Sequence, residues 1–374
     1  MKTSDRLKYV LKFAVALLAT VAVAVGVSMI PVPYVIQTPG PTVDVLGTQG
    51  DTEVLQVGEI PEDLGLALNS DEDEGEIRMV TVSEVGGPGS TVRVSDVAAA
   101  WFQDSAKVLR YSDVYPEEIT ADEVQEMSSA QMESSHSAAQ ITAFDYLGVP
   151  METTMTVVAT VPGTGAEGVL EEGDVLKAIT LPDGTSFPIT SPSVPFTLLR
   201  SIPVGSVLEV DIVRDGVEKT VEVKTTAPTP NDAGEVEDGS KMGAYLDADV
   251  EAPFDVTIHL EKVGGPSAGL AFALGIVDEF TEGGLTNGEK IAATGVLDYS
   301  AHVSPVGGIR QKMFGAKRDG AEWFLLPRDN CEDTLEGVPT GLTAVPVSTL
   351  QEGLDAMGKI AAGDTADLQS CPAS

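Results

Sequence analysis

The chain has 374 residues and a formal net charge of −36, because 58 Asp and Glu outnumber 22 Lys and Arg. So acidic a surface argues against binding to nucleic acid or to anionic lipid headgroups, and it keeps a protein soluble. The length exceeds that of a single core and predicts two or three domains.

The N-terminal residues predict a membrane-spanning helix. An uncharged apolar run covers residues 13–30, and no charge follows until Asp44. Four basic residues precede the run: Lys2, Arg6, Lys8 and Lys12. As a helix the run is about 27 Å long, close to the hydrocarbon thickness of a bilayer, and the basic flank keeps the N-terminus cytoplasmic. We expect residues 1–36 to form a cytoplasmic stub and a single-pass anchor in the cell membrane, with an extracytoplasmic body. The alternative is a signal peptide cleaved near Ala22-Val23-Ala24.

The next stretch, residues 37–136, is expected to form a β-rich N-terminal region. Residues 53–57 and 77–82 are short apolar runs that predict strands, and the acidic residues 71–74 between them predict a solvated loop. After Val94 the pattern becomes helical and polar, and residues 97–102 are its one strongly apolar segment. This region shows no recognisable chemistry.

The glycines of residues 157–176 mark a strand-to-helix turn and a tight turn before Asp174, and residues 207–214 with Asp215-Gly216 predict a closing hairpin. Together they resemble a bacterial PDZ domain, expected at residues 137–227. PDZ domains bind peptide ends by adding a strand to a sheet edge. The resemblance implies a carboxylate-binding loop formed by Tyr146, Leu147, Gly148 and Val149. The alternative is a β-rich spacer that binds nothing.

A linker rich in Pro and Thr at residues 226–232 precedes the stretch Gly264–Gly269, in which small residues surround Ser267. The apolar run 270–274 predicts a buried helix that opens at Pro266 or Ser267. A hydroxyl there lies among unpaired backbone N–H groups at the positive end of the helix dipole. Ser267 is therefore a candidate nucleophile, and N–H groups near it are candidate oxyanion donors.

A second glycine turn, Gly307-Gly308, opens a helix predicted over Ile309–Arg318, with Lys312 on its first turn. A lysine accepts a serine proton only if burial lowers its pKa enough to leave the amine neutral. Three apolar neighbours on the same helix are expected to supply part of its pocket: Ile309, Met313 and Phe314. A strand is predicted at Trp323–Leu326.

The two stretches, with Thr294-Gly295 between them and Lys312 lying 45 residues after Ser267, resemble the proteolytic domain of Lon-type Ser-Lys peptidases. The resemblance covers about Val256–Pro346. It implies Ser267 as nucleophile, Lys312 as general base and Thr294 as a hydroxyl that orients the lysine. Three further residues are expected to support the site: Gly265, Pro266 and Ala268. The chain departs from many Lon proteins at Val296, where they carry glutamate, and at Arg310-Gln311.

A Ser-His-Asp triad is the competing chemistry, and the chain offers only His136, His259 and His302 for it. None lies in a recognisable triad motif. His259 lies on the apparent strand leading to Ser267, where Lon proteins also tend to carry histidine, and the resemblance implies that it forms part of the wall of the site. Cys331 and Cys371 are expected either to form a disulfide in an oxidising compartment or to remain as two free thiols. Without nearby histidine they make a poor zinc site, so no metal is predicted.

In this order, anchor, PDZ domain and Ser-Lys domain resemble membrane-anchored Lon-like proteases of the YlbL type. The expected class is α+β multidomain, with the proteolytic domain at residues 228–350 and a C-terminal tail at 351–374. No P-loop string occurs, so no ATPase is predicted. The resemblance implies an ATP-independent serine endopeptidase without cofactors that acts on unfolded or tail-exposed extracytoplasmic proteins, as a monomer or a homo-oligomer. The alternatives are a non-catalytic PDZ adaptor and a chaperone for secreted proteins.

Overall fold

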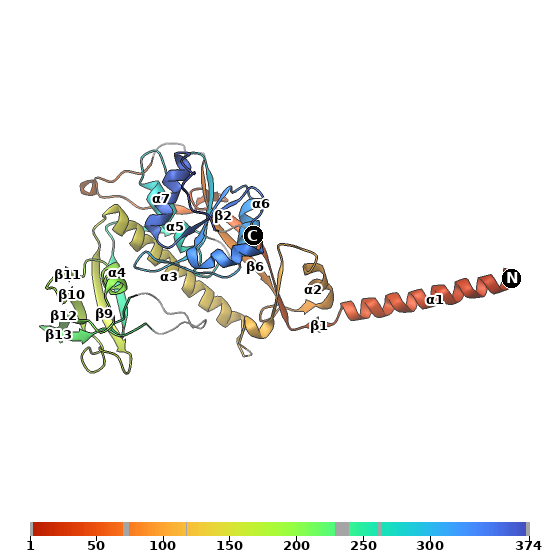
Figure 1. Cartoon of the computed structure of the whole chain (residues 1–374), viewed down its shortest axis with the longest axis horizontal. Coiled ribbons are helices and arrows are strands. Elements are labelled where there is room, and N and C mark those ends of the chain that lie inside the picture. The colour runs from red at the N-terminus through yellow and green to blue at the C-terminus, as the bar shows by residue number, and fades with distance from the viewer. Residues whose placement is uncertain (1–2, 70–74, 117, 229–238, 261–262, 372–374) are drawn as a thin grey trace.

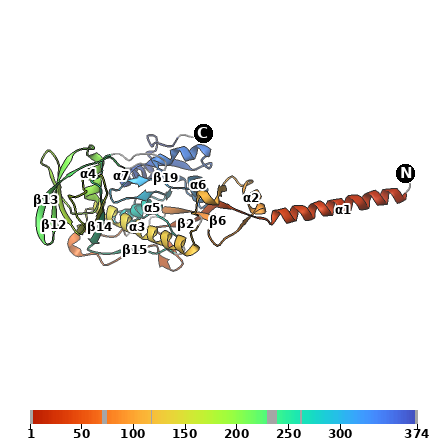
Figure 2. The same cartoon turned by 90° about the horizontal axis from the view of Figure 1, so that it is seen from below.

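The computed structural model describes residues 3–371 except 70–74, 117, 229–238 and 261–262. The predicted acidic loop at 71–74 and much of the predicted linker at 226–232 therefore lie outside the described residues. Helix α1 (Thr3–Ser28) projects away from the rest of the chain (Figures 1 and 2). Its segment Leu11–Ser28 is long and apolar enough to cross a membrane, and none of it is buried against the body.

The main sheet has six strands in the order β20-β19-β16-β6-β2-β8. Its strands are β2 (Tyr34–Asp44), β6 (Glu76–Val85), β8 (Lys107–Arg110), β16 (Lys290–Ala293), β19 (Trp323–Pro327) and β20 (Thr343–Val347). The four strands from β20 to β6 are parallel, whereas β2 is antiparallel to both β6 and β8. The predicted separate N-terminal region is thus corrected, since its strands extend the sheet of the C-terminal region. Ile77 and Met79 of β6 are buried in the apolar core that also contains α5.

Helices cover both faces of this sheet (Figures 1 and 2). Helix α5 (Gly269–Glu279) is buried along almost its whole length, and α3 (Ala121–Leu147) and α7 (Leu350–Ala361) pack against it. Helix α6 (Ile309–Arg318) packs on β2 and β6, with Ile309 and Met313 in a separate apolar cluster. The predicted helix over 309–318 is confirmed, whereas the predicted tail from 351 is wrong, because Leu354, Met357 and Ile360 of α7 are core residues.

A second sheet, in the order β13-β12-β10-β9-β14, forms a unit with its own apolar core. Its elements are β9 (Glu152–Thr160), β10 (Val175–Thr180), β11 (Ser186–Pro188), α4 (Ser193–Ser201), β12 (Val207–Arg214), β13 (Val217–Lys224) and β14 (Ala244–Glu251). We call this the β9–β14 unit. The predicted hairpin at 207–224 is confirmed, and Asp215 and Gly216 both have positive φ in its turn. The predicted domain limits, residues 137 and 227, are both wrong. Helix α3 continues to Leu147 and packs in the core around α5, and β14, which follows the linker, pairs with β9.

Short elements complete the fold. They are β1 (Pro31–Val32), β3 (Thr48–Gln49), β4 (Thr52–Glu53), β5 (Leu55–Val57), β7 (Val92–Arg93), α2 (Val94–Ala100), β15 (Val256–Ile258), β17 (Val296–Leu297), β18 (Val303–Ser304) and three 3₁₀ turns at Glu62–Leu64, Tyr111–Asp113 and Arg328–Glu336. The loop between β17 and β18 meets the β9–β14 unit, because Arg200 of α4 donates to Asp298 and Ser300. The ring of Phe196 lies 6.0 Å from that of Tyr299 in the same loop.

Cys331 and Cys371 form a disulfide with their Cα atoms 5.2 Å apart, which ties the chain end beside β20. A disulfide between residues 40 positions apart lowers the conformational entropy of the unfolded chain and so stabilises the folded state. We expect Cys331→Ala with Cys371→Ala to lower the free energy of unfolding by about 2–4 kcal/mol. Urea denaturation measures this loss, and dithiothreitol should reproduce it in the wild type alone. An unchanged urea midpoint in the double variant would contradict the stabilising role.

Candidate active site

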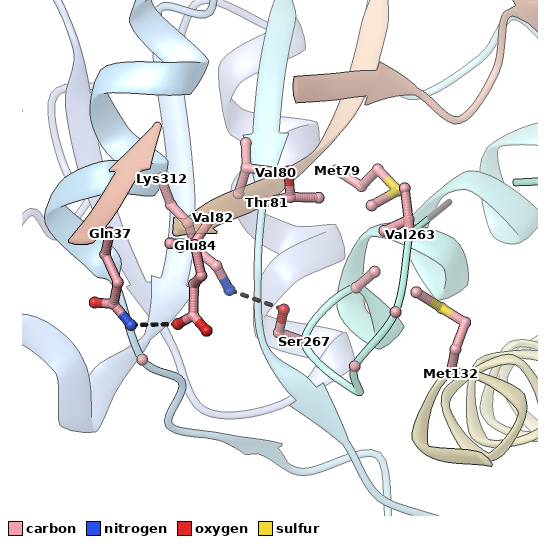
Figure 3. Close-up of a pocket in the computed structure, with 14 residues that line it drawn as sticks. Gln37, Met79, Val80, Thr81, Val82, Glu84, Met132, Val263, Ser267 and Lys312 are labelled. Carbon is pink, nitrogen blue, oxygen red and sulfur yellow. Dashed lines mark hydrogen bonds between the residues drawn. The ribbon is translucent and has the colours of Figure 1, made fainter. Parts of the chain in front are cut away.

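Ser267, just before α5, and Lys312, on the first turn of α6, meet beside Thr294, which directly follows strand β16. The Lys312 amine donates to the Ser267 hydroxyl, with 2.8 Å between Nζ and Oγ (Figure 3). The amine also donates to the Thr294 hydroxyl at 2.9 Å. The structure thus brings together the three side chains that the sequence singled out from separate segments.

Lys312 is a buried lysine. Its side chain starts on the first turn of α6, where its N–H donates to Gly308, and the residue is 3% exposed. Burial lowers the pKa of its amine from 10.5 to about 7. A large fraction of the amine is therefore neutral near pH 7, as a general base requires. Phe314, predicted to help bury this lysine, instead stacks with Arg310 at 5.6 Å and lines a different, more open pocket.

The loop that carries Ser267 is held by helix α3. The Gly265 N–H donates to the Ser128 carbonyl at 3.0 Å, and the Ser135 hydroxyl donates to the Pro266 carbonyl at 3.1 Å. Gly264 passes so close to α3 that an added Cβ would lie 1.9 Å from Ser128 Oγ. Gly265 has φ of 91°, a conformation that favours glycine.

These contacts correct part of the predicted oxyanion site. The Gly265 N–H is already hydrogen-bonded to the Ser128 carbonyl, and Pro266 has no N–H. In this stretch, the backbone N–H groups of Ser267 and Ala268 therefore remain as candidate donors to the oxyanion. Helix α5 begins at Gly269 with Ala268 as its N-cap, two or three residues later than predicted. Ser267 still lies next to the positive end of a buried eleven-residue helix.

The strand end at Thr294 fixes the main chain of Ser267. The Thr294 hydroxyl donates to the Ser267 carbonyl at 3.0 Å, and the Gly295 N–H donates to the same oxygen at 2.9 Å. Thr294 is fully buried. Its hydroxyl thus accepts from the lysine and donates to the serine backbone, which links both halves of the site.

A pocket of about 230 Å³ opens beside the hydroxyl of Ser267. Figure 3 shows Met79, Met132 and Val263 on one side of Ser267, with Gln37 and Glu84 on the other. Gln37 donates to Glu84 at 2.6 Å. Because β16 pairs only with residues 76–79 of β6, the β16-side edge of the later β6 residues has no neighbouring strand in the part of the chain that the structure describes. An extended peptide fits such an edge.

No histidine is hydrogen-bonded to Ser267 among the described residues. His136 on α3 contacts the edge of Phe272, and burial lowers the pKa of its imidazole. His259 is hydrogen-bonded to Gln56 at 2.9 Å and does not line the pocket, so its expected place in the wall is wrong. His302 forms an isolated antiparallel bridge with Thr349, the N-cap residue of α7. Within the described ranges, no group of three or more His, Cys, Asp or Glu side chains is placed to share a metal ion.

The predicted carboxylate-binding loop is also corrected. Tyr146 and Leu147 are the last turn of α3, Gly148 ends that helix with φ of 70°, and Val149 is buried in the core around α5. None of them precedes an outer strand. The outermost strand on the β9 side is β14, and the Ser240 N–H, just before it, donates to Leu199 at the end of α4.

Comparison with known proteins agrees with this geometry. The family model of the Lon protease (S16) C-terminal proteolytic domain matches residues 241–357, which include Ser267, Thr294 and Lys312. Residues 241–357 are a Lon-type proteolytic domain. The chain is 35% identical to the Lon protease of Azospirillum brasilense over 107 residues, covering 27% of this chain and 13% of that protein. It is 32% identical to Lon protease 1 of Bacillus subtilis over 117 residues, covering 29% and 15%.

The match covers less than a fifth of each of these relatives. Strands β2 and β6, which complete the sheet of the Lon-type domain, come from outside the matched residues. Among solved structures, the chain is similar to the PDZ domain of the SdrC-like protein from Listeria monocytogenes. The identity is 23% and the TM-score 0.19, with 25% of this chain and 85% of that domain covered.

Proposed function

We propose that this protein is an ATP-independent, membrane-anchored serine endopeptidase with a Ser267–Lys312 dyad. One observation carries the proposal: a lysine amine with a pKa of about 7 lies 2.8 Å from the serine hydroxyl, inside a Lon-type domain. An ordinary structural lysine stays charged and exposed, and a buried one without a carboxylate partner is typical of a functional site.

The proposed reaction follows from the hydrogen bonds. Neutral Lys312 takes the proton of Ser267 as Oγ attacks the scissile carbonyl, and it later gives that proton to the leaving amine. The N–H groups of Ser267 and Ala268 stabilise the oxyanion at the start of α5. Water then hydrolyses the acyl-enzyme, again with Lys312 as base. Thr294 keeps the amine directed at the hydroxyl throughout, because it is hydrogen-bonded to both partners.

The proposed substrates are unfolded or tail-exposed proteins on the extracytoplasmic side. An edge such as that of β6 takes a main chain in extended form, which a folded protein does not offer. The basic residues before the apolar run 13–30, three of them in the first turns of α1, favour an N-terminus in the cytoplasm and thus a body outside. The outer strand β14 is the proposed recruiting edge of the β9–β14 unit, in place of residues 146–149. Assembly into a homo-oligomer remains a prediction.

Hydrolysis of fluorescently labelled, unfolded casein by the full-length protein in detergent tests this function. We expect peptide release without any nucleotide, and we expect a peptide boronate, which forms a tetrahedral adduct with an active serine, to block it. Casein that binds but stays intact would favour the adaptor. Suppressed aggregation without cleavage would favour the chaperone.

A further inference from the structure

Two large apolar side chains stand exposed at the end of helix α2. Trp101 is 76% exposed and Phe102 is 91% exposed. The same helix turns Val97 and Ala100 inward, into a small cluster with Ile36 and Val92. The exposed pair therefore belongs to a folded tip, and its outward direction is fixed by the buried face behind it.

This tip lies close to the point where the chain leaves α1. The Val94 N–H donates to the Ile30 carbonyl at 3.1 Å, and Pro31 of β1 pairs with Arg93 of β7. Figures 1 and 2 both show α2 as the element of the body beside the C-terminal end of α1. Seven helical residues rise about 10 Å, so the tip lies within about that distance of the end of the apolar helix.

We propose that Trp101 and Phe102 insert into the headgroup interface of the same bilayer that α1 crosses, on the side of the body. The proposal rests on the membrane anchor of the proposed function. The interface on each side of the hydrocarbon core is several Å deep, which the tip reaches from its tether. Tryptophan prefers this layer because its apolar ring contacts the acyl chains while its N–H is hydrogen-bonded to water or headgroups. Because the protein is strongly acidic, anionic lipid headgroups would repel it, so the expected lipid surface is a zwitterionic one.

The contact has a consequence for the dyad. The loop after α2 is hydrogen-bonded to the start of α6: Arg310 donates to the Asp104 carbonyl at 2.7 Å, and Gln311 donates to the Ser105 carbonyl at 3.2 Å. Lys312 follows directly on α6. A single helix leaves the body free to swivel about residues 29–30, whereas a second contact at the tip holds α6 and the pocket at one orientation to the membrane.

Tryptophan fluorescence tests the insertion. The chain has two tryptophans, so Trp323→Phe leaves Trp101 as the only one. In full-length protein reconstituted into phosphatidylcholine vesicles, brominated acyl chains should lower Trp101 emission at least about twofold. The matched control is Trp101→Phe, in which Trp323 of the main sheet should keep its emission.

Resistance of the reconstituted protein to carbonate extraction reports separately on α1. Embedded protein with an unquenched Trp101 would overturn the tip contact and leave the anchor standing. Protein released by carbonate would overturn the anchor, and the tip contact with it. If Trp323→Phe does not fold, the wild type minus the Trp101→Phe variant gives the same signal.

Discussion

Replacing Ser267 by alanine, or Lys312 by methionine, is expected to lower kcat/KM for unfolded casein at least about 10³-fold. The alanine removes the attacking oxygen, and the methionine keeps the shape of the lysine without its base. Lys312→Arg should be as inactive, because a guanidinium stays protonated. The matched control is Lys317→Met on the same helix, where the amine is bonded to the Gly341 carbonyl away from the pocket. Activity in Lys312→Met would contradict the dyad.

The pH profile of the wild type tests the same dyad without mutation. Only the neutral amine accepts the serine proton, so kcat/KM should rise with pH through a midpoint near the lysine pKa of about 7 and then level off. A rate independent of pH between about 6 and 8 would contradict an amine with this pKa.

Stability separates lost chemistry from lost folding. The pKa of Lys312 is lowered in the folded state, so between about 7 and 10.5 the unfolded chain binds the proton that the folded chain releases. Stability therefore rises with pH through this window, and the amine destabilises the fold most below pH 7. Lys312→Met should be inactive yet melt at a higher temperature than the wild type at neutral pH.

Arg214→Ala is expected to lower the urea midpoint of the β9–β14 unit, because it removes the charged partner of the Asp174 carboxylate. Arg214 donates from Nε and Nη2 to the two oxygens of Asp174 at 2.7 and 2.6 Å, and it also donates to the Val169 carbonyl. The Asp174 carboxylate is fully buried, so the alanine variant leaves a buried charge without its partner. Urea denaturation of the full-length chain should show the early loss of this unit, while boronate binding at Ser267 persists at low urea.

Glu171→Gln is the matched control. Its carboxylate also pairs with Arg214, but the side chain is 65% exposed. Loss of this charge should therefore lower the free energy of unfolding by less than about 1 kcal/mol. The hydrogen bond from Arg214 holds the pKa of Asp174 below its usual range. The stabilisation is therefore present above pH of about 4 and is lost as the pH falls through the lowered value. Equal effects of the two variants would contradict the importance of burial.

Each half of the dyad lies in a short local pattern: a glycine-proline turn before a buried helix, and a glycine pair before a short helix. What joined the two halves into a dyad was the resemblance of their order and spacing to Lon-type peptidases. The supporting contacts from α3 could not be read in this way. Ser128 acts through its backbone carbonyl, which any residue supplies, and Ser135 lies in a polar helix without an apolar pattern. The spacing of Ser128, Met132 and Ser135 places them one turn apart on one face of α3. This spacing is the only sequence signal of the contact, and it is too common to predict one.

Domain limits were harder because strand partners lie far apart in sequence. Residues 77–82 were correctly predicted as a strand, but nothing local shows that β16, over two hundred residues later, is its neighbour. In the same way, β14 follows the linker yet completes the sheet that begins at β9. Alternation predicts that a strand has one buried face and does not identify the strand beside it.

The connection between α1 and the main sheet is very short. Only residues 29–33 lie between the end of α1 and the first residue of β2, and two of them already pair with β7. Even fully extended, each residue adds at most about 3.5 Å. If α1 crosses the bilayer, the protein has no stalk, and its reach is that of its own body. The active site would then stay at a constant distance from the bilayer, and the protein would cleave polypeptides at the membrane surface.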